Sequence, residues 1–135
     1  MAENITCKEV QTIQEVCDFL KKAGAYYLAT NEGAQPHVRP FGTAHMYDGR
    51  LYIQTGRSKP VSQQMAVNPQ VELCAMDGGT WIRVIATAVE DNSREAKQSM
   101  LDAYPFLKDS YSPDDEDTQV FYLKDVKATI SAYAV

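Results

Sequence analysis

The spacing of apolar residues changes along this chain, and each change marks the start of a predicted element. From Val10 to Leu20, apolar residues recur every three or four positions, which is typical of an amphipathic helix. Thr6, followed three residues later by Glu9, fits a capping box at the start of this helix. Gly24 lies just past two lysines and is a typical helix stop. We therefore predict an N-terminal helix that begins near Thr6 and ends before Gly24.

Beyond that glycine the chain changes to the alternation of apolar and polar residues that half-buried strands show. Turn sequences such as Asp48-Gly49 separate the segments. The predicted strands cover residues 26–30, 37–47, 50–55, 71–76, 80–90, 118–123 and 127–133. Two further helices are predicted, over residues 59–67 and 92–103. The first three strands are expected to form an antiparallel meander.

The whole pattern predicts a mainly β (β+α) fold. Short antiparallel strands with an N-terminal helix and two inserted helices favour a closed or nearly closed β-barrel, because closure hides the edges of a sheet. The 135 residues contain no internal repeat and no linker long enough to divide them. A chain of this length can bury one sizeable core, so residues 1–135 are predicted to form a single domain.

Composition and charge narrow the classes of partner. Thirteen Lys and Arg against 18 Asp and Glu give a formal net charge of −5, whereas a nucleic-acid binder usually carries a basic excess. No apolar run approaches the roughly 20 residues needed to cross a bilayer. The first residues lack a basic-then-apolar leader, and Cys7, Cys17 and Cys74 cannot all pair within one chain. We therefore expect a cytoplasmic protein with reduced thiols that binds neither nucleic acid nor membrane.

Motifs that carry chemistry are sparse. The sequence has none of the short motifs typical of phosphate-binding loops, zinc proteases or serine hydrolases. Its two histidines, His37 and His45, lie on one face of a predicted strand but eight residues apart. At about 3.3 Å per residue, one metal ion cannot bind both. No metal site is therefore predicted.

The predicted strand over residues 37–47 divides into two faces. One face carries mostly polar and aromatic side chains: His37, Arg39, Phe41, Thr43 and His45. The other carries small or apolar side chains, which suit the interior of a tight barrel: Val38, Pro40, Gly42, Ala44 and Met46. Since Pro40 has no N–H, this strand is expected at an edge or an irregularity, where neighbouring backbone groups are free to contact a ligand.

Donors for an anion gather where the second and third predicted strands precede the next helix. Arg39 and Lys59 are placed to bracket a phosphate, and Thr55 and Ser58 can add hydroxyl donors. The N-terminus of the helix adds backbone N–H groups and a favourable dipole. A simpler interpretation stays open, in which Arg57 and Lys59 are solvated loop cations and Ser58 only caps the helix.

Several short segments follow one another in a distinctive order: Tyr27-Leu28-Ala29-Thr30, His37-Val38-Arg39-Pro40-Phe41-Gly42, Asp48-Gly49, Leu51-Tyr52-Ile53-Gln54-Thr55, Ser58-Lys59, Asn68-Pro69-Gln70-Val71-Glu72-Leu73 and Trp81-Ile82-Arg83-Val84. In this order and spacing they resemble the pyridoxamine 5′-phosphate oxidase-like, FMN-binding split-barrel superfamily. The resemblance runs from residue 25 to residue 133, which is nearly the whole chain.

The resemblance implies a split β-barrel of about six or seven antiparallel strands and an obligate homodimer with two FMN sites at the subunit interface. It implies that Arg39 and Lys59 contact the FMN phosphate, with Ser58 and Thr55 beside them. It also implies further contacts from residues on both subunits. These are the backbone of Arg39-Pro40-Phe41 and Gln54-Thr55 along the ring and ribityl chain, Gln63 or Gln64 at the ring edge, and Trp81 and Arg83 from the partner subunit. For Trp81, plain barrel or dimer packing is an equal alternative.

The sequence also departs from the oxidase that gives the family its name. That enzyme holds its substrate with Arg and His in a C-terminal segment, whereas this chain ends ATISAYAV, with no Arg after Arg94 and no His after His45. Oxidation of pyridoxamine phosphate is therefore not expected. The resemblance implies an FMN-dependent oxidoreductase that passes hydride or electrons to or from an unidentified small molecule. The alternatives are a non-catalytic flavin-binding protein for storage, sensing or stress response, and a relative that holds deazaflavin F420 or haem, with His37 or His45 as the haem ligand.

Overall fold

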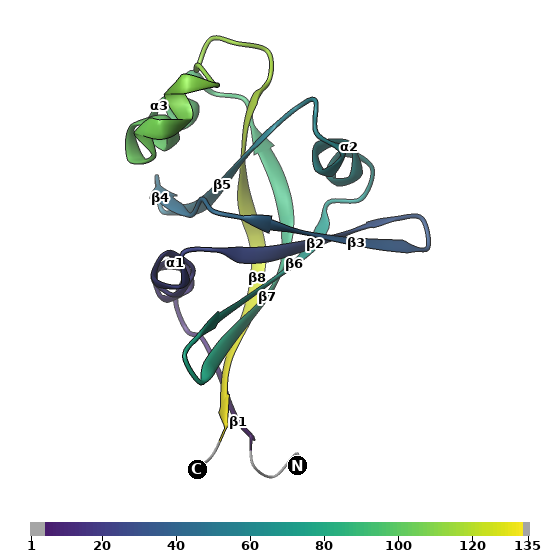
Figure 1. Cartoon of the computed structure of the whole chain (residues 1–135), viewed down its shortest axis with the longest axis vertical. Helices are drawn as coiled ribbons and strands as arrows, with labels where there is room; N and C mark the ends of the chain where they lie inside the picture. Colours follow the sequence, from purple (N-terminus) through teal and green to yellow (C-terminus); the bar gives the residue numbers. More distant parts are fainter. Residues whose placement is uncertain (1–4, 134–135) are drawn as a thin grey trace.

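Antiparallel strands make up about half of the computed structural model, which describes residues 5–133 (Figure 1). The strands are β1 (Ile5–Glu9), β2 (Tyr26–Glu32), β3 (Gln35–Phe41), β4 (His45–Tyr47), β5 (Arg50–Gly56), β6 (Gln70–Asp77), β7 (Thr80–Asp91) and β8 (Thr118–Tyr133). The helices are α1 (Ile13–Ala23), α2 (Pro60–Val67) and α3 (Arg94–Ala103), followed by a 3₁₀ helix (Pro105–Asp109). The predicted mainly β fold with an N-terminal helix and two inserted helices is confirmed.

The strands form one open sheet in the order β3-β2-β6-β7-β8-β5-β4, and β1 pairs with β8. β3 and β4 therefore lie at opposite ends of the path. Both antiparallel pairings of the predicted meander are present, β2 with β3 and β4 with β5, but they form two separate hairpins and not one continuous meander. The predicted strand over residues 37–47 is interrupted between Phe41 and His45. There, contacts with side chains replace strand pairing: the Tyr26 hydroxyl donates to the Thr43 carbonyl at 2.7 Å, and the Ala44 N–H donates to the Tyr104 hydroxyl at 3.0 Å.

This interruption also changes which residues of the segment face inward. In β3, Arg39 lies opposite the buried Leu28, and Val38 is 69% exposed. Pro40 and Gly42 are exposed as well. The prediction that these three residues face the interior of the barrel is therefore wrong. Ala44 and Met46 do face the core. Alternation has a period of two only within one unbroken strand, and it shifts by one residue between β3 and β4. β3 is an edge strand, as Pro40 predicted.

The N-terminal helix begins later than predicted. Thr6 and Glu9 lie in β1, opposite Ala132 and Thr129 of β8, so the capping box expected there is wrong. The cap is Thr12, whose hydroxyl accepts from the Glu15 N–H at 3.2 Å. The same Thr-x-x-Glu spacing occurs at both places, but pairing with β8 holds the residues of β1 in an extended conformation. Gly24 ends the helix as predicted, with φ 83° and its N–H on the Leu20 and Lys21 carbonyls.

Three other boundaries differ from the predictions. The two strands expected after residue 117 are one strand, β8, which turns at Asp125 (φ 54°) opposite an irregularity between Ile85 and Thr87. Helix α3 is capped by Ser93, whose hydroxyl accepts from the Ala96 N–H at 3.2 Å. Helix α2 is preceded by Lys59 as its N-cap and has no side-chain cap, so Ser58 does not cap it.

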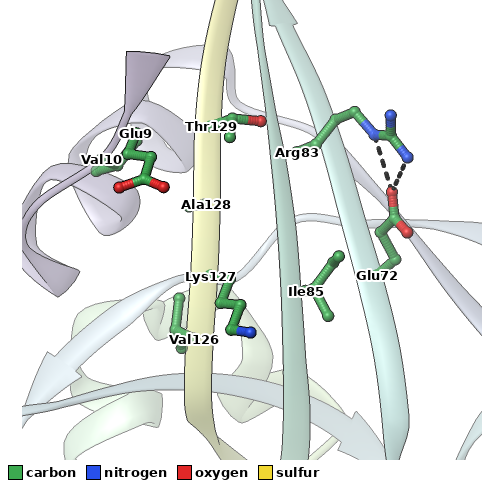
Figure 2. A pocket seen from close by; sticks show the side chains of 9 residues that line it. All are labelled: Glu9, Val10, Glu72, Arg83, Ile85, Val126, Lys127, Ala128 and Thr129. Atoms are coloured by element: carbon green, nitrogen blue, oxygen red, sulfur yellow. Dashed lines mark hydrogen bonds and ion pairs between the residues drawn. The ribbon is translucent and has the colours of Figure 1, made fainter. Parts of the chain in front are cut away.

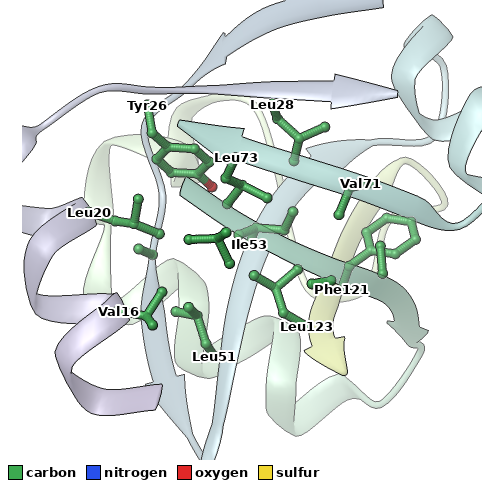
Figure 3. Packing of buried hydrophobic residues seen from close by; sticks show 14 of the residues in the cluster. Val16, Leu20, Tyr26, Leu28, Leu51, Ile53, Val71, Leu73, Phe121 and Leu123 are labelled. Carbon is green, nitrogen blue, oxygen red and sulfur yellow. The ribbon is translucent and has the colours of Figure 1, made fainter. Parts of the chain in front are cut away.

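The main core lies between α1 and one face of the sheet (Figure 3). Val16 and Leu20 of α1 point toward Leu51 and Ile53 of β5, and all four are at most 2% exposed. Burying each such side chain stabilises the fold by about 1.5–3 kcal/mol. A second cluster of Tyr52, Ala96, Met100 and Val120 packs α3 against the far end of β5 and β8. Among residues 5–133, no helix is long and apolar enough to span a membrane.

Candidate functional site

A cavity of about 270 Å³ lies where the end of β3, β5 and the start of α2 meet. The 3₁₀ helix closes one side of it with two apolar residues, Phe106 and Leu107. The other lining residues are Arg39, Pro40, Phe41, Gly42, Thr43, Gln54, Thr55, Lys59 and Val61. The structure therefore brings together six of the residues predicted for the site: Arg39, Pro40, Phe41, Gln54, Thr55 and Lys59.

Arg39 reaches this cavity from the inner face of β3. Its Nη1 donates to the Thr30 hydroxyl at 2.8 Å and to the Leu28 carbonyl at 3.3 Å, and its Nη2 donates to Gln64 Oε1 at 2.5 Å. All three acceptors are neutral, and Arg39 forms no ion pair with any carboxylate in the described residues 5–133. Burial lowers the pKa of Arg39 from its ordinary value, but an arginine remains protonated at neutral pH. A positive charge without a counter-charge therefore lies at the cavity.

Lys59 brings a second positive charge to the same cavity. It is the N-cap of α2, a helix with Pro60 at its start and no acidic residue in its first turn. Lys59 is exposed and forms no ion pair within the part of the chain that the structure describes. Helix N-termini carry unpaired N–H groups and a partial positive charge, which favour a bound anion.

The β5 wall of the cavity is polar but uncharged. Gln54 and Thr55 are 7% and 3% exposed. The Gln54 backbone N–H donates to the Thr43 hydroxyl at 2.9 Å, and its side-chain amide donates to the Thr55 carbonyl at 3.1 Å. Arg39 and Lys59 are the only ionisable groups among the lining residues. The arrangement suits a ligand with an anionic end and an uncharged polar or aromatic body, and it offers no carboxylate or imidazole for proton transfer.

Some predicted site residues lie elsewhere. The Ser58 N–H donates to Asp117 Oδ1 at 2.8 Å, and Ser58 does not line the cavity. Arg57, which was not among the predicted site residues, does not line the cavity either and pairs with Glu90 at 2.9 Å. Gln63 is exposed and lines a different hollow, of about 480 Å³, between α2 and the β7–β8 pair. Gln64 is buried and contacts Arg39.

Trp81 and Arg83 lie on the outer face of the sheet, outside this cavity. Trp81 packs on Tyr133 with ring centroids 5.2 Å apart. Arg83 binds Glu72 through two N–H groups, at 2.7 and 2.9 Å. This ion pair lies beside Ile85 and Lys127 in a cavity of about 600 Å³ (Figure 2). Although that cavity is larger, its arginine is already paired with a carboxylate.

Most of the large apolar side chains that are exposed lie on this same outer face of the sheet. Tyr27, Met76, Trp81 and Ile85 share this face. By the strand register Met76 lies opposite Trp81, whereas Tyr27 lies opposite Cys74 and Ile85 lies opposite Glu72. Six of the eight exposed large apolar residues in the described range belong to this face: Ile5, Tyr27, Val38, Met76, Ile85 and Tyr133. An apolar surface of this kind is typical of a protein interface. We call these six residues, together with Trp81, the outer apolar face.

The two histidines are placed away from the cavity. His45 hydrogen-bonds with Ser99 at 2.7 Å, and burial together with nearby Lys21 lowers its pKa. His37 lies 3.3 Å from Glu32. In residues 5–133, no group of three or more His, Cys, Asp or Glu side chains could hold a metal ion.

Thr30, Thr43, Phe106 and Leu107 contribute to the site but were not predicted. Thr30 could have been found, since it shares a face with the apolar Tyr26 and Leu28 in a predicted strand and is the one polar residue there. The other three come from irregular segments, which only the folded chain brings to the cavity.

Comparisons with known proteins give one family. The model of the family described as pyridoxamine 5′-phosphate oxidase matches residues 12–128. A NimC/NimA family protein from Clostridium acetobutylicum is 44% identical, with 89% of this chain and 87% of that chain covered and a TM-score of 0.87. No curated protein matches significantly.

Two more distant structures share the fold. One is a pyridoxamine 5′-phosphate oxidase-related, FMN-binding protein from Nostoc punctiforme, with 15% identity, a TM-score of 0.62 and coverage of 84% of this chain and 76% of that one. The other is an FAD-binding protein from Mesorhizobium loti, with 15% identity, a TM-score of 0.64 and coverage of 95% and 98%. At this identity they show similarity of fold alone.

Proposed function

The chain belongs to the pyridoxamine 5′-phosphate oxidase-like family of flavin-binding split barrels, and on this basis we propose that it binds FMN at the Arg39–Lys59 cavity and acts as an FMN-dependent oxidoreductase on a small molecule. The observation that carries the proposal is the charge of Arg39. It lies at a cavity between polar strand walls and a helix N-terminus, and neutral acceptors alone hold it. Distant relatives described as FMN-binding and FAD-binding support a flavin as the ligand.

The residues at the cavity fit a flavin phosphate. Two cations, Arg39 and Lys59, and the N-terminus of α2 all favour a dianion. Phe41, Phe106 and Leu107 offer apolar surface to a ring system, and Gln54 and Thr55 offer polar groups along one wall. We propose that Ser58, next to Lys59, comes beside the phosphate when the flavin binds.

The chemistry of the site agrees with this assignment. Bound FMN would supply the hydride or electron transfer, and the protein's part is then to anchor, orient and shield it. Arg39 and Lys59 would anchor the phosphate. The neutral β5 wall would orient the remainder, and Phe106 and Leu107 of the 3₁₀ helix would shield it from water. A cavity without a carboxylate or histidine suits a reaction in which side chains move no proton.

We propose that the functional unit is a homodimer formed through the outer apolar face. One chain encloses about 270 Å³, whereas pockets for ligands of this size usually measure about 300–1,000 Å³. Pro40 connects the two features, because it lines the cavity and lies opposite Tyr27 of the outer apolar face. A second copy seated there would bury that face and complete the cavity. Trp81 and Arg83 would then reach the flavin of the partner subunit.

The first test is the absorbance spectrum of the freshly purified protein, followed by titration with FMN. A colourless protein that takes up no FMN would overturn the proposal. Stopped-flow reduction by NADH and by NADPH then separates an oxidoreductase from a non-catalytic flavin-binding protein, which no donor would reduce. Parallel titrations with F420 and haem test the two alternative cofactors.

We also propose a cytoplasmic location for the protein. All three cysteines are free, as is usual in a reducing compartment.

A further inference from the structure

Gln64 is a buried amide on α2 with a defined set of partners. It is 7% exposed, and its Oε1 accepts from Thr30 Oγ1 and from Arg39 Nη2, both at 2.5 Å. Thr30 Oγ1 in turn accepts from Arg39 Nη1 at 2.8 Å. The three side chains, from β2, β3 and α2, therefore form a closed ring of hydrogen bonds. This ring fixes the orientation of the guanidinium.

The donors of Arg39 can be counted. A guanidinium has five N–H groups, and three of them are used, two on Nη1 and one on Nη2. Thr30 and Gln64 therefore cover the end of the guanidinium that Nη1 and Nη2 form. Nε and the second Nη2 hydrogen form no hydrogen bond in the described part of the chain. These two donors share one side edge, which is the geometry that binds two oxygens of one phosphate.

The acceptors of Arg39 distinguish it from other arginines of the chain. Arg57, Arg83 and Arg94 each pair with a carboxylate, of Glu90, Glu72 and Asp114 respectively. A carboxylate cancels the charge that it orients. An amide and a hydroxyl orient the guanidinium equally well and leave its charge available.

We propose that Gln64 is a positioning and specificity-determining residue: it aims Arg39 while leaving its positive charge free, so that the site selects FMN over riboflavin. This inference rests on the proposed function. It differs from the contact expected from the family resemblance, because Gln64 acts on the phosphate end through Arg39 and not at the ring edge.

The decisive variant is Gln64→Glu, measured by fluorescence titration with FMN and with riboflavin. The side chain keeps its length and can still accept from Thr30 and Arg39, but its carboxylate pairs with the guanidinium. Because this carboxylate cancels the positive charge that Arg39 offers to the phosphate, FMN is expected to bind about 10- to 100-fold more weakly. Riboflavin affinity should stay within about threefold. Gln11→Glu, an exposed position just before α1, is the matched control for net charge and should leave both affinities unchanged.

A second variant, Thr30→Val, keeps the side-chain shape and removes the hydroxyl that links Gln64 to Arg39. It should also lower the ratio of FMN affinity to riboflavin affinity, with thermal unfolding monitored to confirm that the protein folds. A purely structural role would weaken both flavins equally and would overturn the inference. Equal binding of FMN and riboflavin by the wild type, or an unchanged ratio in Gln64→Glu, would overturn it while leaving flavin binding intact. If the wild type binds neither flavin, the proposed function itself fails.

Discussion

Replacing Lys59 by Ala separates the contribution of this residue to the ligand from its contribution to the fold. The Lys59 side chain is exposed, makes no capping hydrogen bond to α2 and forms no ion pair within residues 5–133. Its loss should therefore change the free energy of unfolding by less than about 0.5 kcal/mol, which corresponds to roughly 2 °C in Tm for a chain of this size. A charge-assisted hydrogen bond to phosphate contributes about 1.5–3 kcal/mol. The Kd for FMN should then rise about 10- to 150-fold.

The assay is a fluorescence titration with FMN beside a thermal melt of the same preparation. Lys124→Ala serves as the control, since Lys124 is exposed on β8 and lines neither the Arg39–Lys59 cavity nor the larger one beside Arg83. It should match the wild type in both measurements. Equal FMN affinity in Lys59→Ala and the wild type would remove Lys59 from the site. A large fall in Tm with unchanged affinity would show that its role is structural.

Three further predictions concern the dimer and the support of α3. Ile85→Arg places a charge on the outer apolar face, where Ile85 is 50% exposed, so light scattering should show a monomer, and an unchanged dimer mass would argue against this interface. Tyr52→Phe removes a 2.7 Å hydrogen bond to Asp91 and should cost about 1 kcal/mol in urea unfolding; an unchanged midpoint would contradict this. Burial raises the pKa of Asp91, but hydrogen bonds from Ser93 and Tyr52 outweigh it and hold that pKa below its ordinary value. The ionised carboxylate therefore stabilises the fold above the pKa of Asp91 in the unfolded chain, and this stability is lost as the pH falls through its pKa in the folded protein. Asp91→Asn should then lose less stability on acidification than the wild type does. An equal loss in the two proteins would refute this.

The sequence was sufficient for most elements of the fold because their apolar periodicity is strong. The alternation in β7 places Ile82, Val84 and Ala86 inward, and all three are at most 1% exposed. The errors occurred where local patterns are degenerate. Thr6 and Thr12 both precede a glutamate at the capping distance, and only the pairing of β1 with β8, more than 100 residues away, decides between them.

The candidate site was predicted in part, for a related reason. Arg39 and Lys59 stand out as cations beside strand ends and a helix start, which are local features. The role of Gln64 depends on where Arg39 and Thr30 lie in the fold. The preceding residue, Gln63, is also a glutamine but lines another hollow, so the sequence alone does not distinguish the two. The interruption after Phe41 likewise depends on hydroxyl groups of Tyr26 and Tyr104, which no local pattern reveals.

Isothermal titration of the flavin-free protein with FMN tests the central claim most directly. We expect saturable binding of one FMN per chain, with a Kd that rises with salt concentration because the contact with the phosphate is ionic. Binding that is insensitive to salt, or the absence of any binding heat together with unquenched flavin fluorescence, would contradict an anion site formed by Arg39 and Lys59.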